Sequence, residues 1–319
     1  MAVELLVDDR WRGMHGIGRY AQEIVSRLSV PWRPAVAGGR PTAALDFLRR
    51  RDWRGVDLVY SPGYNAAARA TRQLITVHDL IHLASPWPQR AKYLAYYELV
   101  AKPTIRRAGK VFTVSEAAAD AIREWLADDR VEVINTGEGV SPAFNLAAPA
   151  APFERPTIVC VGNLRRHKNL STAVEALALV REVGAVMVVP AAEAPALQEL
   201  VTAAGVEGQV EIRSGLSDEE LAELYRGAVA TVFPTLMEGF GLPALESVQC
   251  GTPVLYWAGC RPVREIVQHR GIAVEAATDP REWADAIRQS ASLPPIEPHA
   301  AEVYSWDRAA GVVECQLGG

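Results

Sequence analysis

The sequence predicts an α/β protein with two domains, each built around a parallel β-sheet. Short apolar, β-branched segments alternate with longer amphipathic segments, which is the pattern of βα units. The 319 residues suffice for two domains of roughly 150 residues each. Residues 141–156 are rich in Ala and Pro, lack periodicity and separate two stretches that show this pattern. We therefore expect domains at residues 1–147 and 148–319, with the last helix a candidate to cross back to the first domain.

The first half is expected to begin with a strand and to continue through further βα units. Ser115 directly follows one expected strand and precedes a run of good helix formers. We interpret it as a helix N-cap rather than a nucleophile. The expected strands lie at residues 3–7, 56–61, 74–78, 110–114 and 131–134, and the expected helices at 19–28 and 115–126.

The second half repeats the alternation. Pro195 is compatible with its helix, because the first helical turn tolerates a missing N–H group. The expected strands lie at residues 157–161, 186–190, 210–213, 230–234 and 254–257, and the helices at 170–180, 195–203, 218–227, 242–248 and 301–316. Ligands of such sheets bind outside the carboxyl ends of the strands, so we expect the two sheets to face an interdomain cleft.

Composition narrows the class of protein. Hydrophobic residues make up 49% and charged residues 22% of the chain, which excludes disorder, collagen and coiled coil as whole-chain interpretations. The formal charge of −5 gives no global basic surface, so nucleic acid is not an expected partner. The N-terminal apolar run is too short for a signal peptide, and no segment is long and apolar enough to span a bilayer. The four cysteines lack metal-site spacing, and we interpret them as free thiols of a cytoplasmic protein.

A glycine-containing loop precedes the first expected helix. Gly16 and Gly18 form part of a G-x-G-x-x-A pattern, formally that of dinucleotide-binding proteins. The pattern is weakened by eight intervening residues after the strand and by the lack of an acidic residue about 20 positions later, which argues against a hydride-transfer enzyme. Glycines at a helix start still let backbone N–H groups approach a phosphate or sugar. The alternative is a tight turn without a ligand.

His78 and Asp79 follow another expected strand. Polar residues at the carboxyl end of a parallel strand point toward the ligand crevice, which favours a ligand role for His78 over that of a core residue. His82 lacks this argument and is expected to be structural.

The segment after the strand at 157–161 is basic. Arg165, Arg166, His167 and Lys168 stand between a strand end and a helix start. Cationic side chains at a helix N-terminus suit a diphosphate, so we favour phosphate binding over solvated surface charge.

An acidic, glycine-containing loop follows the strand at 230–234. Glu238 precedes Gly239, Phe240 and Gly241, whose backbone can form an anion-binding nest, and Pro243 suits the first turn of the next helix. Glu246 lies inside that helix and can face the same site. Two Glu residues alone would mean little, but their place in PTLMEGFGLPALE makes the signal strong.

This last segment resembles the E-x7-E motif of family 4 glycosyltransferases, which retain anomeric configuration and use nucleotide sugars. Segments in the same order also resemble that family, namely GIGRYAQEIV, TVHDLIHL, VFTVSEAAADAI, VEVINTGEGV, VGNLRRHKNL, SGLSDEELAELYRGA and YSWDRAA. They span nearly the whole chain and are most similar to the bacterial branch with mannosyltransferases of polysaccharide assembly. The resemblance implies the GT-B fold of two Rossmann-like domains. At 319 residues the chain is short for this family.

The resemblance also implies roles for individual residues. Glu238 and the backbone of Gly239, Phe240, Gly241 and Leu242 would hold the donor sugar, and Glu246 the ribose. Lys168 matches the diphosphate-binding lysine. Gly16 and Gly18 match the loop near the phosphates and acceptor, and His78 matches a residue beside the reacting sugar. Arg213 begins the segment, residues 213–218, that would cradle the base.

One departure from the family pattern concerns the basic loop. Asn163 follows Gly162 where many members carry Arg, so the second diphosphate cation must be Arg165 or Arg166. His167 stands where close relatives often have Arg.

The implied mechanism is metal-independent, retaining hexosyl transfer to a hydroxyl group. Cations would stabilise the negative charge that grows on the departing diphosphate. No cofactor and no metal are expected, because the cationic loop can replace a divalent ion. Neither Asp8-Asp9 nor Asp128-Asp129 has the intervening residue of a D-x-D element. A GDP-mannose donor is the first expectation, with UDP or TDP sugars as alternatives.

The acceptor is less defined by the sequence. A glycan, a lipid-linked acceptor and a small molecule all remain open, with Trp11, His15, Arg19 and Tyr64 as candidate contacts that packing roles also explain. Residues 87–97 could dock at the inner face of a membrane, although a core-packing stripe fits better. Two other functions are alternatives: an epimerase or hydrolase for nucleotide sugars on the same fold, and a catalytically silent partner subunit.

Overall fold

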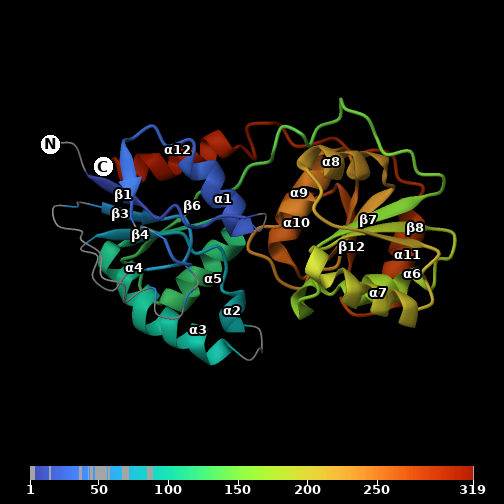
Figure 1. Cartoon of the computed structure of the whole chain (residues 1–319), viewed down its shortest axis with the longest axis horizontal. Helices are drawn as coiled ribbons and strands as arrows, with labels where there is room; N and C mark the ends of the chain where they lie inside the picture. The colour runs from blue at the N-terminus through green and yellow to red at the C-terminus, as the bar shows by residue number, and fades with distance from the viewer. Residues whose placement is uncertain are drawn as a thin grey trace. The chain divides into compact units, whose positions relative to one another are not determined.

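The computed structural model describes residues 4–13, 16–35, 38–41, 43, 46, 56, 58–66, 72–84 and 89–318. The chain forms two compact units, Met1–Gly139 together with Ala301–Gly319, and Val140–Ala300. Each unit contains a parallel α/β sheet (Figure 1), as the sequence predicts. The division falls at Gly139, earlier than the expected boundary at 147/148. The reason is that Phe144 packs in the core of the second unit, beside Tyr225.

The sheet of the first unit has the order β2-β1-β3-β4, followed by the pair β5-β6. A parallel bridge between Thr76 and Phe112 links the two parts. The strands β1, β3 and β4 are buried along their whole length, which agrees with their largely apolar sequences. The strands are β1(Leu5–Val7), β2(Trp32–Pro34), β3(Leu58–Ser61), β4(Gln73–Ile75), β5(Lys110–Thr113) and β6(Glu132–Asn135).

The helices of the first unit come from both ends of the chain. Ser115 caps α5 by accepting a hydrogen bond from the N–H of Ala118, which confirms its expected role. The C-terminal helix α12 lies beside α1 (Figure 1), and Arg27 pairs with Asp307 at 2.8 Å. The helices are α1(Gly16–Val25), α2(Ile81–Ala84), α3(Arg90–Tyr96), the π-helical turn η2(Tyr97–Ala101), α4(Lys102–Ala108), α5(Glu116–Leu126) and α12(Trp306–Leu317).

The sheet of the second unit contains six parallel strands in the order β12-β11-β10-β7-β8-β9. The chain begins this sheet at β7, continues outward through β8 and β9, and returns to place β10 on the other side of β7. Strand order therefore reverses between β7 and β10, which is the topological switch point where open α/β sheets bind ligands. The strands are β7(Thr157–Val161), β8(Gly184–Val188), β9(Val210–Arg213), β10(Ala230–Phe233), β11(Val254–Trp257) and β12(Gly271–Val274).

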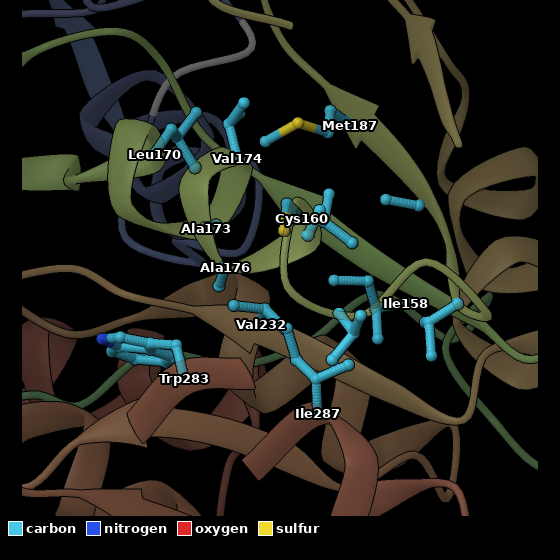
Figure 2. Packing of buried hydrophobic residues seen from close by; sticks show 14 of the residues in the cluster. Ile158, Cys160, Leu170, Ala173, Val174, Ala176, Met187, Val232, Trp283 and Ile287 are labelled. Carbon is cyan, nitrogen blue, oxygen red and sulfur yellow. The ribbon is translucent and has the colours of Figure 1, made fainter. Parts of the chain in front are cut away.

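Helices cover both faces of this sheet (Figure 1). On one face, Trp283 and Ile287 of α11 and Val174 of α6 pack against Ile158 and other strand residues (Figure 2). On the other face, Tyr225 of α8 packs in a second cluster. The helices are η3(Arg166–Lys168), α6(Leu170–Leu177), η4(Ala191–Glu193), α7(Ala194–Ala203), α8(Asp218–Gly227), α9(Leu242–Gln249), α10(Arg261–Val267) and α11(Pro280–Ser290). The sequence reasoning missed α10, α11 and β12.

Candidate functional site

Two loops of the second unit meet at the switch point. The basic loop, residues 162–169, follows β7, and the acidic loop, residues 234–241, follows β10. The N–H of Leu236 donates to the carbonyl of His167 at 2.7 Å, and the hydroxyl of Thr235 donates to the same carbonyl at 3.2 Å. The structure thus brings together two motifs that the sequence analysis identified separately.

Lys168 and Glu238 form the central contact between these loops. Lys168 Nζ donates to Glu238 Oε1 at 2.5 Å, and the two side chains are only 17% and 11% exposed. The ammonium group also lies 5.7 Å from the centre of the Phe233 ring, within cation–π range. An opposite charge and an aromatic face therefore fix the position of this cation.

The backbone around Lys168 is held by side-chain hydrogen bonds. Asn169 adopts a left-handed conformation with φ of 53°, donates to the carbonyl of Ala277 and accepts from the hydroxyl of Thr172. Asn163 accepts a hydrogen bond from the N–H of Arg165 at 3.1 Å. Asn163 therefore shapes the turn that presents the arginines.

Arg165 and Arg166 are exposed. Neither guanidinium forms an ion pair within the part of the chain that the structure describes. Both stand on the turn that carries Lys168, so the loop combines one paired cation with two solvated ones. Such a cluster suits a polyanionic ligand.

The acidic loop leads into α9 through a glycine with positive φ. Gly241 has φ of 117°, a conformation that L side chains rarely adopt, and a Cβ here would lie 3.2 Å from Val263 Cγ2. Gly239 and Phe240 are buried, and Leu242 begins the helix. Backbone N–H groups of the first helical turn carry partial positive charge at this position.

Glu246 lies in α9 and is buried, with 7% exposure. Its carboxylate accepts a hydrogen bond from the Tyr225 hydroxyl at 3.3 Å. Burial, together with the neighbouring Glu246 charge, raises the pKa of Tyr225 well above its ordinary value. The hydroxyl therefore stays protonated and remains a donor to Glu246.

Arg213 ends the edge strand β9, at the same carboxyl edge of the sheet but two strands from β7. Its Nε donates to Glu211 Oε1 at 2.6 Å. The assignment of this arginine to the nucleotide base remains a prediction.

His78, a predicted site residue of the first unit, lies in a buried polar group. His78 is 6% exposed, its Nε2 lies 2.9 Å from the carbonyl of Pro62, and its Nδ1 lies 3.7 Å from Glu138 Oε1. Tyr20 of α1 packs edge-on against the imidazole at 4.7 Å. The sequence reasoning missed Glu138 and Tyr20, although both stand in segments that resemble the family.

Gly16 and Gly18 differ in their surroundings. A Cβ on Gly18 would lie 2.4 Å from the carbonyl oxygen of Gly13, whereas Gly16 has open space around its Cα. Only glycine permits this close approach of helix α1 to the preceding loop at position 18, and the ligand role of both glycines remains a prediction.

Two candidate acceptor contacts are core residues instead. Trp11 and Tyr64 are 4% and 8% exposed and pack against each other with ring centres 5.2 Å apart, and the Trp11 indole N–H donates to Asn65. Arg19 is half-buried, and His15 lies outside the described residues.

The tyrosines of the aromatic segment at residues 87–97 also pack inward, whereas Leu94 is exposed. Trp87 lies outside the described residues. Tyr97 is 1% exposed, and the Tyr96 hydroxyl donates to the carbonyl of Tyr64. His82 stacks on Tyr93 with ring centres 4.4 Å apart, which agrees with a structural role.

The described residues contain neither a metal-binding cluster nor a membrane-spanning helix. No group of three or more His, Cys, Asp or Glu side chains there could hold a metal ion. Asp8 pairs with Arg10 at 2.6 Å. No described helix combines the length and apolar character that a membrane span requires.

Two parallel α/β units, with a basic and an acidic loop at the switch point of one, define a GT-B type of protein. A family model described as Glycosyl transferases group 1 matches residues 144–303, and one described as Glycosyltransferase Family 4 matches residues 9–137. The chain belongs to the group 1 glycosyltransferases, in family 4.

Known relatives are distant. The O-antigen chain mannosyltransferase RfbU of Salmonella typhimurium is 26% identical over 226 residues, covering 70% of this chain and 62% of that protein. The D-inositol 3-phosphate glycosyltransferase of Streptomyces avermitilis is 28% identical over 229 residues, covering 63% of this chain and 49% of that protein. The match thus spans less than two thirds of either relative.

The fold is similar to that of a solved structure over the whole chain. Sucrose-phosphate synthase from Thermosynechococcus elongatus superposes with a TM-score of 0.69 at 18% identity, covering 100% of this chain and 95% of that chain. At this identity the similarity concerns the fold alone.

Proposed function

We propose that this protein is a retaining glycosyltransferase that moves a hexose from a nucleoside diphosphate sugar to a hydroxyl group, without a metal ion. The observation that carries the proposal is the contact of Lys168 with Glu238 at the switch point of the second unit, beside Arg165 and Arg166. This arrangement supplies cations for a diphosphate and a carboxylate for sugar hydroxyls within one site.

Lys168, with Arg165 or Arg166, stabilises the negative charge that develops on the leaving diphosphate. Such charge stabilisation is usually the largest single contribution to catalysis. Glu238 and the backbone of residues 239–242 hold the sugar. Glu246 accepts a hydrogen bond from a ribose hydroxyl. Its buried carboxylate already accepts one from Tyr225, and this contact orients it.

The remaining predicted residues support the same reaction. Asn163 shapes the arginine turn, and Arg213 lies near the base. In the first unit, Gly16 and Gly18 open α1, and His78 contributes to the sugar and acceptor side.

GDP-mannose is the first donor to test, with UDP and TDP sugars next. One relative is named a mannosyltransferase, which supports mannose. Another is named a D-inositol 3-phosphate glycosyltransferase, so the relatives' names do not share one acceptor. A glycan, a lipid-linked acceptor or a small molecule is therefore proposed.

A location in the cytoplasm, with peripheral contact at the inner membrane face, is part of this proposal. Leu94 and Leu99 support it, since they are 42% and 75% exposed on consecutive helical turns. Lipid-linked acceptors would be reached from that surface.

A thermal-shift panel of GDP, UDP, TDP and ADP tests the donor. A nucleotide at about 100 times its Kd stabilises by about 2.7 kcal/mol, so one nucleotide should raise the unfolding temperature selectively. Incubation of the matching nucleotide sugar with and without acceptor, in EDTA, then tests transfer. Complete conversion without acceptor would indicate an epimerase or hydrolase, and no binding of any nucleotide would refute the proposal.

A further inference from the structure

The Lys168–Glu238 pair joins the two groups that the proposed function assigns to different parts of the donor. Lys168 is assigned to the diphosphate and Glu238 to the sugar. In the structure they bind each other at 2.5 Å. A diphosphate must therefore compete with Glu238 for this ammonium group.

The environment makes that competition costly. Both side chains are largely screened from water, and the Phe233 ring covers a further part of the ammonium surface. Removing one partner of a desolvated pair leaves the other charge uncompensated. A diphosphate that takes Lys168 would also place its own negative charge beside the Glu238 carboxylate.

The other groups near the pair do not relieve this cost. Arg165 and Arg166 are exposed and favour any diphosphate, whether or not it carries a sugar. The Cys260 thiol is close to Glu238, and burial followed by the Glu238 charge raises the pKa of Cys260 to about 12. This thiol therefore stays neutral and supplies no charge.

A sugar hydroxyl changes the balance. A hydroxyl group is one donor and can replace the Lys168 N–H on Glu238, so the carboxylate stays hydrogen-bonded while Lys168 moves to the phosphate. A nucleoside diphosphate without the sugar carries hydroxyl groups only on its ribose, which the proposed function assigns to Glu246, so it offers no such donor to Glu238.

We propose that Glu238 distinguishes the donor from the spent nucleotide by competing with the diphosphate for Lys168. The inference rests on the proposed function. The sugar-bearing donor satisfies Glu238, whereas the nucleoside diphosphate left after transfer does not. Glu238 then regains Lys168, and release of the product is favoured.

Calorimetric titration of GDP and GDP-mannose tests this, or the equivalent pair if the panel selects another base. Glu238→Gln should bind GDP about tenfold more tightly than the unsubstituted protein, which is about 1.4 kcal/mol. Its affinity for GDP-mannose should be unchanged or weaker. Glu265→Gln is the matched control, because it removes one carboxylate from the partly exposed pair with Arg261, 2.8 Å apart in the same unit, and should leave both affinities unchanged.

Lys168→Met separates competition from simple repulsion. If Glu238→Gln tightens GDP equally in the Lys168→Met background, the carboxylate acts by repulsion and the proposal is overturned. Unchanged or weaker GDP binding by Glu238→Gln also overturns the proposal. In that case, binding of GDP-mannose by the unsubstituted protein still supports the donor function. Failure of that protein to bind any nucleotide sugar refutes the donor function instead. Glu238→Ser, with the same expectation, serves if the amide variant fails to fold.

Discussion

Gly241→Ala is expected to weaken both the stability and the activity of the second unit. Gly241 stands between the acidic loop and α9 with φ of 117°, and an added Cβ would meet Val263 Cγ2 at 3.2 Å and Ile266 Cδ1 at 3.7 Å. A strained backbone conformation of this kind costs about 1–3 kcal/mol. The Val263 side chain must also yield by a few tenths of an ångström, because 3.2 Å is tighter than most Cβ contacts.

Together these effects predict a loss of about 2–3 kcal/mol. For a unit of this size that corresponds to a fall in unfolding temperature of about 4–12 °C, measured by calorimetry. Turnover should fall by about 10²-fold, the cost of a misplacement of ~1 Å in a site, because Glu238 and the nest residues Gly239 and Phe240 directly precede this glycine.

Two other glycines provide controls. Gly205 has φ of 63° and open space around its Cα, so Gly205→Ala isolates the backbone cost of about 1–2 kcal/mol. Gly208 has open space and no positive φ, so Gly208→Ala should be neutral. If Gly241→Ala unfolds at the same temperature as Gly208→Ala and turns over normally, the assignment of strain to this turn is wrong.

Three further predictions concern charge and thiol chemistry. Lys168→Ala should lower turnover at least ~10²-fold in an assay of sugar transfer, the scale for loss of one charge-stabilising donor, whereas Arg281→Ala, on an exposed face of α11, should not. Burial lowers the pKa of His299 from its ordinary value of 6.5, so the folded state binds this proton less readily than the unfolded state. With respect to this group, the fold is therefore most stable above pH 6.5. The free energy of unfolding should decrease by up to about 1.4 kcal/mol per pH unit as the pH falls below 6.5. The free energy of unfolding of His299→Gln should lack this pH dependence. Cys315 is exposed, while burial raises the pKa of each of the other three cysteines to about 12, so native alkylation at pH 8 should modify one thiol and alkylation in denaturant four.

The sequence located most of the local elements of the second unit. β7, β9, β10 and β11 lie where the apolar runs predict them, and the expected α8 begins with a complete capping box at Ser217 and Glu220. These features depend on neighbouring residues, so periodicity and capping rules detect them. The strand expected at 186–190 lies instead at Gly184–Val188, because pairing with β7 sets its limits.

The sequence by itself determined the α/β class, the two loops that carry the candidate chemistry and the family. Only the tertiary structure decided that Lys168 and Glu238, 70 residues apart, share one ion pair, because the order of strands brings β7 and β10 together. It also buried Trp11 and Tyr64 in a core and joined α12 to the first unit. Burial and strand order depend on contacts between distant segments, and no local pattern encodes such contacts.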